Sequence, residues 1–491
     1  MSALRRLTRR RFLTQGGRGA AGLALLGALG PRAAAAAAAR MNVVVIIVDS
    51  VRADHVGAYG GHRVGTPSLD RLARQSLRFT RARPEAFPTV PARRAIMSGR
   101  RSFPFRDWRP TRGLPKNPGW ENIPKGRPIW TDPLREAGWR TGYVTDNPWI
   151  LNVAWDEFRS RFDRPVVVKG QTPYRGRPRG RVSARLLRRH LLPAQRRTSE
   201  AGRVREWLAA NLGRRGEEDF LPARVFNAAM QWLDSEAGRG PFALVVDSFD
   251  PHEPWDPPGS YARRQGGGTY HGVKPIQPFG APGQRMRDAH LARGALRPIR
   301  NLYEAELALV DKWLGRFLDK LDDMGLRDNT LVLLLSDHGV LLGERGWVGK
   351  HSSQIHREVY RVPFMIRDPR RRKAGRTSRY FASTHDVGPT VLSYLGVPAP
   401  EGMDGHDLTP LLAGEQPRKR SVFTARYGNY VAAGDGRWLL IDTVDHRQPR
   451  LYDTKRDPGE HHDLARRKPR VVRRLWRRII ADAGGKALQK Y

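Results

Sequence analysis

The chain has 491 residues, enough to bury a large core in one large domain with a smaller one beside it. Its 88 Lys and Arg residues exceed its 48 Asp and Glu residues by 40, and a field of this sign favours anionic partners such as phosphate or sulfate esters, anionic polymers and acidic membrane surfaces. The chain has no cysteine, which excludes disulfides, thiolate metal ligands and a cysteine nucleophile.

The pattern of residues 1–40 indicates an export signal. Thr8 to Leu13 (TRRRFL) resembles a twin-arginine motif, and it is followed by the apolar stretch Ala20 to Leu29 and by an alanine run at 33–39, where a signal peptidase could cut. The apolar stretch is too short to span a bilayer. We therefore predict a signal peptide read by the twin-arginine (Tat) export machinery and a periplasmic or extracellular location. A basic tail without this function is the alternative.

Three unbroken apolar runs, 43–48, 242–246 and 331–335, predict strands covered on both faces in a parallel sheet. Each run is followed by polar groups of the kinds that bind metals: Asp49 and Ser50, then Asp247, Asp250 and His252, then Asp337 and His338. In an open α/β sheet, ligands bind beyond the carboxyl ends of the strands. One such end could be a polar turn, but three together predict a divalent metal at the rim of the sheet.

The segment Phe87 to Gly99 is the second candidate for chemistry. Its two prolines favour an extended lead-in, and a helix is expected to begin just past Pro91. Thr89 would then lie beside exposed helix N–H groups, where an anion is favoured. Arg93, near the same end, can donate two hydrogen bonds to a tetrahedral oxyanion. The alternative, that Thr89 only caps the helix, fits the pattern equally well.

Other elements are expected along the chain from local patterns. A helix begins at Pro67, a helix and then a strand occupy 130–144, and apolar spacing over 301–324 predicts an amphipathic helix with a left-handed cap at Gly325. The Gly- and Pro-rich stretch 257–287 is expected to be a long loop. A glycine-flanked loop at 346–351 carries Lys350 and His351, and 362–366 is one more strand.

The domain organisation is predicted from composition. Residues 41–370 form the catalytic domain, which contains a basic insertion at 161–215 with 16 Lys or Arg against three acids. Within the insertion, 173–181 is expected to lack fixed structure and 186–212 to be helical. The insertion is either a solvated face or a basic lid over the site. Residues 371–491, with short alternating strands at 421–426, 430–433 and 438–442 and a basic C-terminal helix, form a small antiparallel subdomain.

Six motifs in the right order make the chain resemble the sulfatase family of the alkaline phosphatase superfamily over residues 42–465. They are Asn42 to Gly60, Thr89 to Arg93, Asp250 to Trp255, Ser336 to Lys350, Asp386 to Thr390 with Asp404-Gly405, and Leu451 to Glu460. The resemblance implies an α/β, alkaline-phosphatase-like fold: a large mixed, mainly parallel sheet between helices, with a small C-terminal antiparallel sheet.

The resemblance also implies roles for individual residues. The metal ligands fall on Asp49, Asp337 and His338, with neutral Ser50 in place of the family's second acid. Thr89 takes the position of the nucleophile, and its hydroxyl is also expected among the metal ligands. The remaining positions implied for catalysis are Arg93, which orients the nucleophile, and His252 and Lys350, which contact the transferred group or protonate the leaving group.

Two departures from the family pattern bear on the reaction. True sulfatases need a cysteine or serine that is oxidised to formylglycine, and Thr89 cannot become that aldehyde. The family's Gly-Lys-Trp-His segment is missing, with Thr145 to Pro148 in its place. The resemblance therefore implies an exported metal-dependent ester hydrolase acting on phosphate or sulfate esters through Thr89. The alternatives are a phosphoglycerol-type transferase, a sulfatase that uses Thr89 directly, and a non-catalytic binding protein on the same scaffold.

Oxygen ligands with one imidazole favour one calcium, magnesium or manganese ion over zinc. An independent zinc site would need a further Asp/His/His group, for which His351, His385 and Asp250 are the candidates, although their spacing supports it poorly. His55, His356 and His385 are expected to serve packing or hydrogen bonding. The expected partner is an anionic ester, polymer- and lipid-linked esters included, and no specific nucleic acid partner is expected.

Overall fold

The computed structural model describes residues 41–491 except 107, 172–179, 266–272 and 281–282. The predicted export signal at 1–40 and most of the segment 173–181 lie outside the described residues. Within the described part of the chain, no helix is both long and apolar enough to cross a membrane.

An eight-stranded sheet forms the centre of the molecule. Its strands, in spatial order, are β11 (Thr377–Ser378), β2 (Leu77–Phe79), β10 (Phe364–Arg367), β7 (Thr330–Leu335), β1 (Asn42–Val48), β5 (Phe242–Ser248), β3 (Arg140–Thr145) and β4 (Arg164–Val167). The strands from β7 to β4 run parallel, whereas β10 is antiparallel to both of its neighbours. This confirms the predicted mixed, mainly parallel sheet and its three buried strands.

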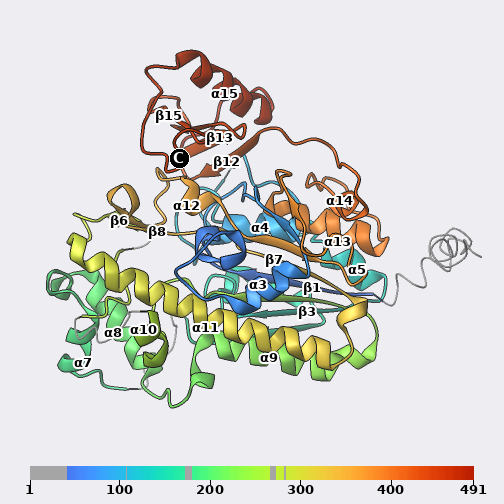
Figure 1. Cartoon of the computed structure of the whole chain (residues 1–491), viewed down its shortest axis with the longest axis horizontal. Coiled ribbons are helices and arrows are strands. Elements are labelled where there is room, and N and C mark those ends of the chain that lie inside the picture. The colour runs from blue at the N-terminus through green and yellow to red at the C-terminus, as the bar shows by residue number, and fades with distance from the viewer. Residues whose placement is uncertain (1–40, 107, 172–179, 266–272, 281–282) are drawn as a thin grey trace, which may run out of the picture.

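Helices cover both faces of the sheet (Figure 1). Alternate side chains of β1 point to opposite sides, so Val44 and Ile46 pack in one core and Val45 and Ile47 in the other. The first core is completed by α3 (Pro67–Arg74), α9 (Leu221–Glu236) and α11 (Leu296–Asp323). The second is completed by α4 (Thr89–Ser98), α5 (Thr131–Glu136), α13 (Val387–Leu395) and α14 (Thr409–Ala413).

A small antiparallel sheet forms the C-terminal part, as predicted. Its strands, in order, are β12 (Phe423–Tyr427), β13 (Tyr430–Gly434), β14 (Trp438–Thr443) and β15 (Arg450–Asp453). The basic helix α15 (Pro469–Asp482) covers it, with Leu475 and Ile479 packed against Leu440. Between residue 370 and this sheet, the chain first adds β11, α13 and α14 to the large unit.

Two segments expected to be loops contain regular structure. The stretch 257–287 includes α10 (Gly259–Gln265) and β6 (Gly283–Arg285), and 346–351 includes β9 (Trp347–Gly349). With β8 (Leu341–Leu342), β6 and β9 make a three-stranded sheet. The loop predictions were wrong there because such short strands depend on cross-strand partners distant in sequence and leave no periodic pattern. Gly325 takes the predicted left-handed conformation, with φ +70°, after α11.

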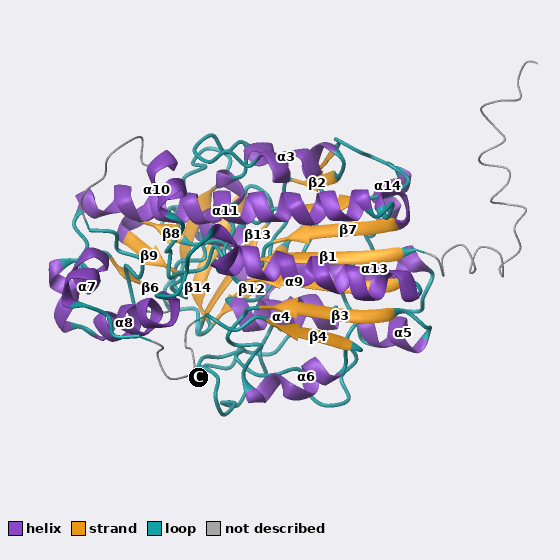
Figure 2. Cartoon of the chain, turned by 90° about the horizontal axis from the view of Figure 1, so that it is seen from below, coloured by secondary structure: helices purple, strands orange, loops and turns teal. Residues whose placement is uncertain are grey.

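The basic insertion begins with β4 at the edge of the sheet, and its helices lie beyond the carboxyl ends of the parallel strands, on the side where the site forms (Figure 2). It contains α7 (Ala184–His190) and α8 (Ser199–Asn211), so the helical prediction for 186–212 is confirmed except for the break between them. Trp207 of α8 donates a 3.0 Å hydrogen bond to Asp256, in the loop that follows β5. The other short helices are α6 (Asp156–Ser160) and α12 (Arg357–Tyr360).

Candidate metal and ester site

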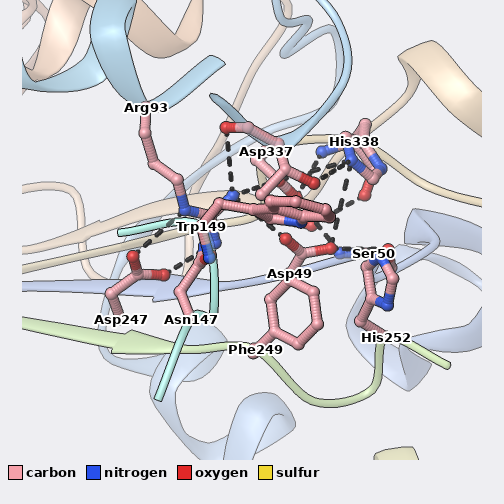
Figure 3. Close-up of polar contacts among 12 residues, drawn as sticks. Asp49, Ser50, Arg93, Asn147, Trp149, Asp247, Phe249, His252, Asp337 and His338 are labelled. Atoms are coloured by element: carbon pink, nitrogen blue, oxygen red, sulfur yellow. Dashed lines mark hydrogen bonds and ion pairs between the residues drawn. The ribbon is translucent and has the colours of Figure 1, made fainter. Parts of the chain in front are cut away.

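The polar ends of the central strands meet at one edge of the sheet. Asp49 and Asp337 follow β1 and β7, and Asp247 is the last residue but one of β5. All three carboxylates are fully buried. Helix α4 brings Thr89 and Arg93 to the same place from one face of the sheet, so residues spread over almost 290 positions form one cluster (Figure 3).

Helix α4 begins at Thr89, three residues before the predicted start just past Pro91. Pro91 is tolerated because the first turn of a helix needs no N–H at that position. Pro88 occupies the N-cap position, and Thr89 makes no capping hydrogen bond. Its hydroxyl oxygen lies instead 3.4 Å from Nε2 of His338 and is almost fully buried. The structure therefore gives the hydroxyl no capping role and places it in the cluster.

Arg93 is the centre of the cluster. Its Nε and Nη2 donate to the two oxygens of Asp247 at 3.0 and 2.7 Å, and its Nη1 donates to Asp337 and lies 3.0 Å from Asp49. Burial alone would lower the pKa of Arg93, but the three carboxylates outweigh it and raise the pKa well above its ordinary value. Because carboxylates occupy most of its donors, Arg93 anchors the site as well as facing Thr89.

Replacing Asp247 by asparagine should lower the free energy of unfolding by about 3 kcal/mol, because the buried guanidinium of Arg93 loses its bidentate partner. Tyr143 donates a 2.7 Å hydrogen bond to the same carboxylate, so Tyr143→Phe is the matched control and should cost about 1 kcal/mol. Urea denaturation of the two variants measures both values. Equal costs for the two would show that the ion pair is not the main contact.

The ligand atoms of Asp49, Asp337 and His338 lie within 4.8 Å of one another and could hold a metal ion. Nδ1 of His338 lies 3.0 Å from the carbonyl of Gly339, which accepts its proton and leaves the lone pair of Nε2 facing the carboxylates. Burial lowers the pKa of His338 to about 4, so the ring is neutral at neutral pH. Among the described residues, this is the one such group.

The charges of this group also fit a cation. Asp49, Asp247 and Asp337 together face the single guanidinium of Arg93. Oδ2 of Asp49 is buried and lies 3.0 Å from Nη1 of Arg93, which also serves Asp337, and burial together with Asp337 raises the pKa of Asp49 well above its ordinary value. A bound divalent ion would supply the positive charge that these carboxylates lack.

Ser50, the weaker predicted ligand, donates its hydroxyl proton to Oδ1 of Asp49 at 2.6 Å. Its backbone N–H donates to Oδ1 of Asp337 at 3.1 Å, and its φ of +60° is unusual for a residue other than glycine. Ser50 thus links the two carboxylates on either side of it. Its direct contact with a metal stays a prediction.

Lys350 and His252 form a second group at the site. Lys350 follows β9, and its ammonium group donates to Nε2 of His252 at 2.8 Å and to Glu253 at 2.9 Å. Nδ1 of His252 lies 2.7 Å from the backbone carbonyl of Glu253, which fixes its proton there. Burial and then the charge of Lys350 lower the pKa of His252 well below its ordinary value, so the ring is neutral.

Three residues at the site were not assigned roles from the sequence: Asp247, Glu253 and Asn147. Asn147 follows β3, is fully buried, and accepts a 3.0 Å hydrogen bond from the N–H of Trp149 on its Oδ1. Its Nδ2 has no acceptor among the described residues. In the sequence, each of the three stands at or shortly after the end of an apolar strand pattern, but a strand end does not tell which neighbour its side chain contacts.

Comparisons with known proteins identify the family. Residues 41–397 match the family described as Sulfatase, and residues 343–482 match the N-sulphoglucosamine sulphohydrolase C-terminal family. The chain belongs to the sulfatase family. The multifunctional alkaline phosphatase superfamily protein PehA of Trinickia caryophylli is 26% identical over 87% of this chain and 91% of its own length. An arylsulfatase of Clostridium perfringens is 23% identical over 86% and 90%.

Solved structures show the same fold for this sulfatase-family chain. A phosphonate monoester hydrolase of Agrobacterium radiobacter superposes with a TM-score of 0.67 and 20% identity, covering 90% of this chain and 95% of its own. The structure named BT4656, solved with D-glucosamine-2-N,6-O-disulfate, has a TM-score of 0.67 and 18% identity over 91% and 99%. The alkaline-phosphatase-like α/β fold expected from the motifs is confirmed, and with it the general class of a sulfatase-like ester hydrolase.

The remaining histidines of this family member lie outside the metal group. His351 pairs with Ser353 at 2.8 Å, and His356 pairs with Glu460 at 2.8 Å, so neither ring joins an Asp/His/His set. The side-chain amide of Gln171 donates hydrogen bonds to both Asp146 and Asp250. His385 is buried, as the packing role among those expected for it requires, and neither of its ring nitrogens has a hydrogen-bond partner among the described residues.

Proposed function

We propose that the chain is an exported, metal-dependent hydrolase of phosphate or sulfate esters in which the Thr89 hydroxyl is the nucleophile. The observation that supports this most is the place of that hydroxyl. It is buried, makes no capping bond and lies 3.4 Å from His338, beside the carboxylates of Asp49 and Asp337. Pro88 holds the N-cap position of α4, so Thr89 is not needed there as the capping residue.

Asp49, Asp337 and His338 would hold one calcium, magnesium or manganese ion, and Ser50 would add a neutral oxygen. Such an ion lowers the pKa of a nearby hydroxyl and withdraws charge from an ester oxygen. Every other part of the chemistry is assigned to side chains of this chain.

The reaction is proposed as two displacements at Thr89. Oγ1 of Thr89 loses its proton to solvent and forms a bond to phosphorus, or sulfur, as the bond from that atom to the alcohol oxygen breaks. Lys350 and the part of Arg93 nearest Thr89 offset the charge on the remaining oxygens. Water then attacks the Thr89 adduct, releases phosphate or sulfate and returns the threonine hydroxyl. An alcohol in place of water would give transfer, the alternative product.

The proton for the departing alcohol is assigned to Lys350 and His252 together. Since Nε2 of His252 already accepts a hydrogen from Lys350, the ring alone has no proton to give in the resting state. Lys350 passes its proton to Nε2, or directly to the alkoxide, and Glu253 keeps the ammonium group in position. This assignment refines the role expected of His252.

Phosphoryl chemistry is favoured over sulfuryl chemistry. Thr89 cannot be oxidised to formylglycine, and a simple alkoxide releases a sulfate adduct poorly. The relatives include proteins named arylsulfatase and phosphonate monoester hydrolase, which supports a site for singly charged esters of either element. A non-catalytic scaffold would have no physical need to keep the metal group together with Thr89 and Lys350.

The proposal is tested with a panel of aryl esters. Purified protein loaded with calcium, magnesium or manganese is given matched phosphate monoesters, phosphate diesters, phosphonate monoesters and sulfate esters. We expect a phosphorus ester to have the highest kcat/KM. Turnover of the sulfate ester above every phosphorus ester would reject the phosphoryl assignment.

Replacing Lys350 by methionine should raise the pKa of His252, because the ring loses the positive neighbour that, after burial, does most to lower it. The ring of the variant should therefore take up a proton at a higher pH than the ring of the wild type does. We also expect kcat to fall by about 10²-fold or more. The measurements are an NMR titration of the His252 ring and the pH profile of kcat/KM.

The matched control for this experiment is Lys312→Met. Lys312 pairs with Glu217 on the exposed face of α11 and should change neither quantity. If His252 titrates alike in the wild type and in Lys350→Met, the contact between Lys350 and His252 does not set its protonation.

Replacing Arg9 and Arg10 by lysine should leave the precursor in the cytoplasm, because the export receptor reads the paired guanidinium groups. Cell fractionation with immunodetection measures this. Arg5 and Arg6 changed to lysine serve as the control and should leave export intact. Export of the Arg9 and Arg10 variant at the normal level would rule out the twin-arginine signal.

A further inference from the structure

A second cavity, of about 640 Å³, lies between the large unit and the C-terminal sheet. It is lined by the segment 83–85 that leads into α4, by 381–383 and His385, by 418–424, and by α15 near Asp482. None of the residues of the metal group, nor Thr89, His252 or Lys350, lines it. The cavity is therefore separate from the ester site.

Arg83, on the wall of this cavity, has no anionic partner. Its guanidinium carbon lies 4.2 Å from the ring centre of Tyr360 and 4.6 Å from that of Phe423, so the group packs on aromatic faces. Its Nε and Nη1 are buried without a hydrogen-bond partner among the described residues. Burial lowers the pKa of Arg83, and the nearby Tyr360 and Glu460 offset this only in part.

Two other partly buried arginines near this cavity do have partners. Arg101 pairs with Asp482 at 2.6 Å, and Arg420 makes two hydrogen bonds to Asp386 at 2.7 and 2.8 Å. The lack of a partner at Arg83 therefore does not follow from the large number of arginines in the chain. It is a property of this place.

His385 is the second group without a partner on the same wall. It is 2% exposed, and both of its ring nitrogens are buried without a hydrogen bond. The nearest acidic atoms are in Asp386 at 3.9 Å and Asp404 at 4.0 Å, beyond hydrogen-bond distance. Buried polar groups in proteins are almost always satisfied, so an unsatisfied histidine beside an unsatisfied arginine indicates a missing acceptor.

We propose that this cavity binds an oxoanion, a sulfate or phosphate group that is either free or part of a larger ester. One such group accepts hydrogen bonds from the guanidinium of Arg83 and from an N–H of His385. Three further cations line the cavity and form no ion pair among the described residues: Arg418, Lys419 and Arg478. Of the acids that line it, Glu85 already accepts two backbone N–H groups, Asp404 accepts the backbone N–H of Arg101, and Asp482 is held by the side chain of Arg101.

The cavity is close enough to the ester site for one extended molecule to reach both. Glu85 lines the cavity and lies four residues before Thr89, a length of chain that spans at most about 14 Å. An anionic polymer or a substrate with two acidic groups could place one group here and another at Thr89. A free product ion is the other source of the same chemistry.

The test is calorimetric titration of the full-length protein at constant ionic strength with three probes: inorganic sulfate, inorganic phosphate and a sulfated disaccharide. We expect saturable binding of at least one probe. Arg83→Gln should weaken it about tenfold or more, and Arg418→Gln, on the exposed rim, should weaken it several-fold. Thr89→Ala should leave it unchanged, which separates this site from the proposed ester site.

The matched control is Arg376→Gln, which removes the same charge from an exposed position in the neighbouring basic cleft. It should change the affinity by less than twofold. Tighter binding of the disaccharide than of both ions would identify an ester group as the natural occupant, and the reverse order would identify a free ion. Equal weakening by Arg376→Gln and Arg83→Gln, or no saturable binding of any probe, would overturn the proposal.

Discussion

Replacing Thr89 by alanine should lower kcat by at least about 10³-fold while the protein stays folded and keeps its metal. The variant lacks the oxygen proposed to form the covalent adduct. The three groups that would hold the metal, in Asp49, Asp337 and His338, remain. Stability should change little, because the hydroxyl makes no capping bond in α4.

The measurements are kcat on the best ester of the panel and metal content by elemental analysis. Thr89→Ser keeps a hydroxyl and should retain part of the activity. Thr384→Ala is the matched control. It also removes a buried threonine hydroxyl, but one that lies outside the site and has no hydrogen-bond partner among the described residues. If the Thr89→Ala protein hydrolyses the ester at a normal rate, Thr89 is a structural residue and not the nucleophile.

Replacing Asp337 by asparagine should remove most of the bound divalent metal and most of the activity together. The change takes one of two carboxylates from an oxygen-and-imidazole site, and we expect the metal affinity to fall by at least about 10²-fold. Added calcium, magnesium or manganese at high concentration should restore part of the activity. Metal titration of the stripped protein, followed by assay, measures both effects.

Asp247→Asn is the matched control for metal binding, because it removes a carboxylate from the same cluster but leaves the three predicted ligands in place. Its metal content should stay close to that of the wild type even though its stability falls. Full activity of wild-type protein after complete removal of divalent metal would contradict the assignment of Asp49, Asp337 and His338.

The fold could be predicted from the sequence where the pattern was local. The strands β1, β5 and β7 are unbroken apolar runs, so their type and burial followed directly, and the acids after them marked the edge of the sheet. The start of α4 was missed by three residues, because a proline inside the first helical turn cannot be distinguished in the sequence from a proline that precedes the helix. The strand β9 was missed because its pairing partners lie far along the chain.

The site could be predicted as a set of residues but not as a set of contacts. Thr89, Asp337 and His338 stand in recognisable motifs, and the structure brings them together. The pairing of Arg93 with Asp247 joins residues 154 positions apart, and that of Lys350 with His252 joins residues 98 apart. No sequence spacing indicates that the arginine faces carboxylates or that the histidine is held neutral by a lysine.

The central claim is that Thr89 carries the transferred group, and intact-protein and peptide mass spectrometry test it most directly. The metal-loaded protein is mixed with an activated aryl phosphodiester, quenched within the first turnover and digested. We expect a burst of released phenol equal to the enzyme concentration and a phosphoryl ester mass on the peptide that contains Thr89. Both should be absent in Thr89→Ala. An adduct on another residue, or a full burst in Thr89→Ala, would contradict the claim.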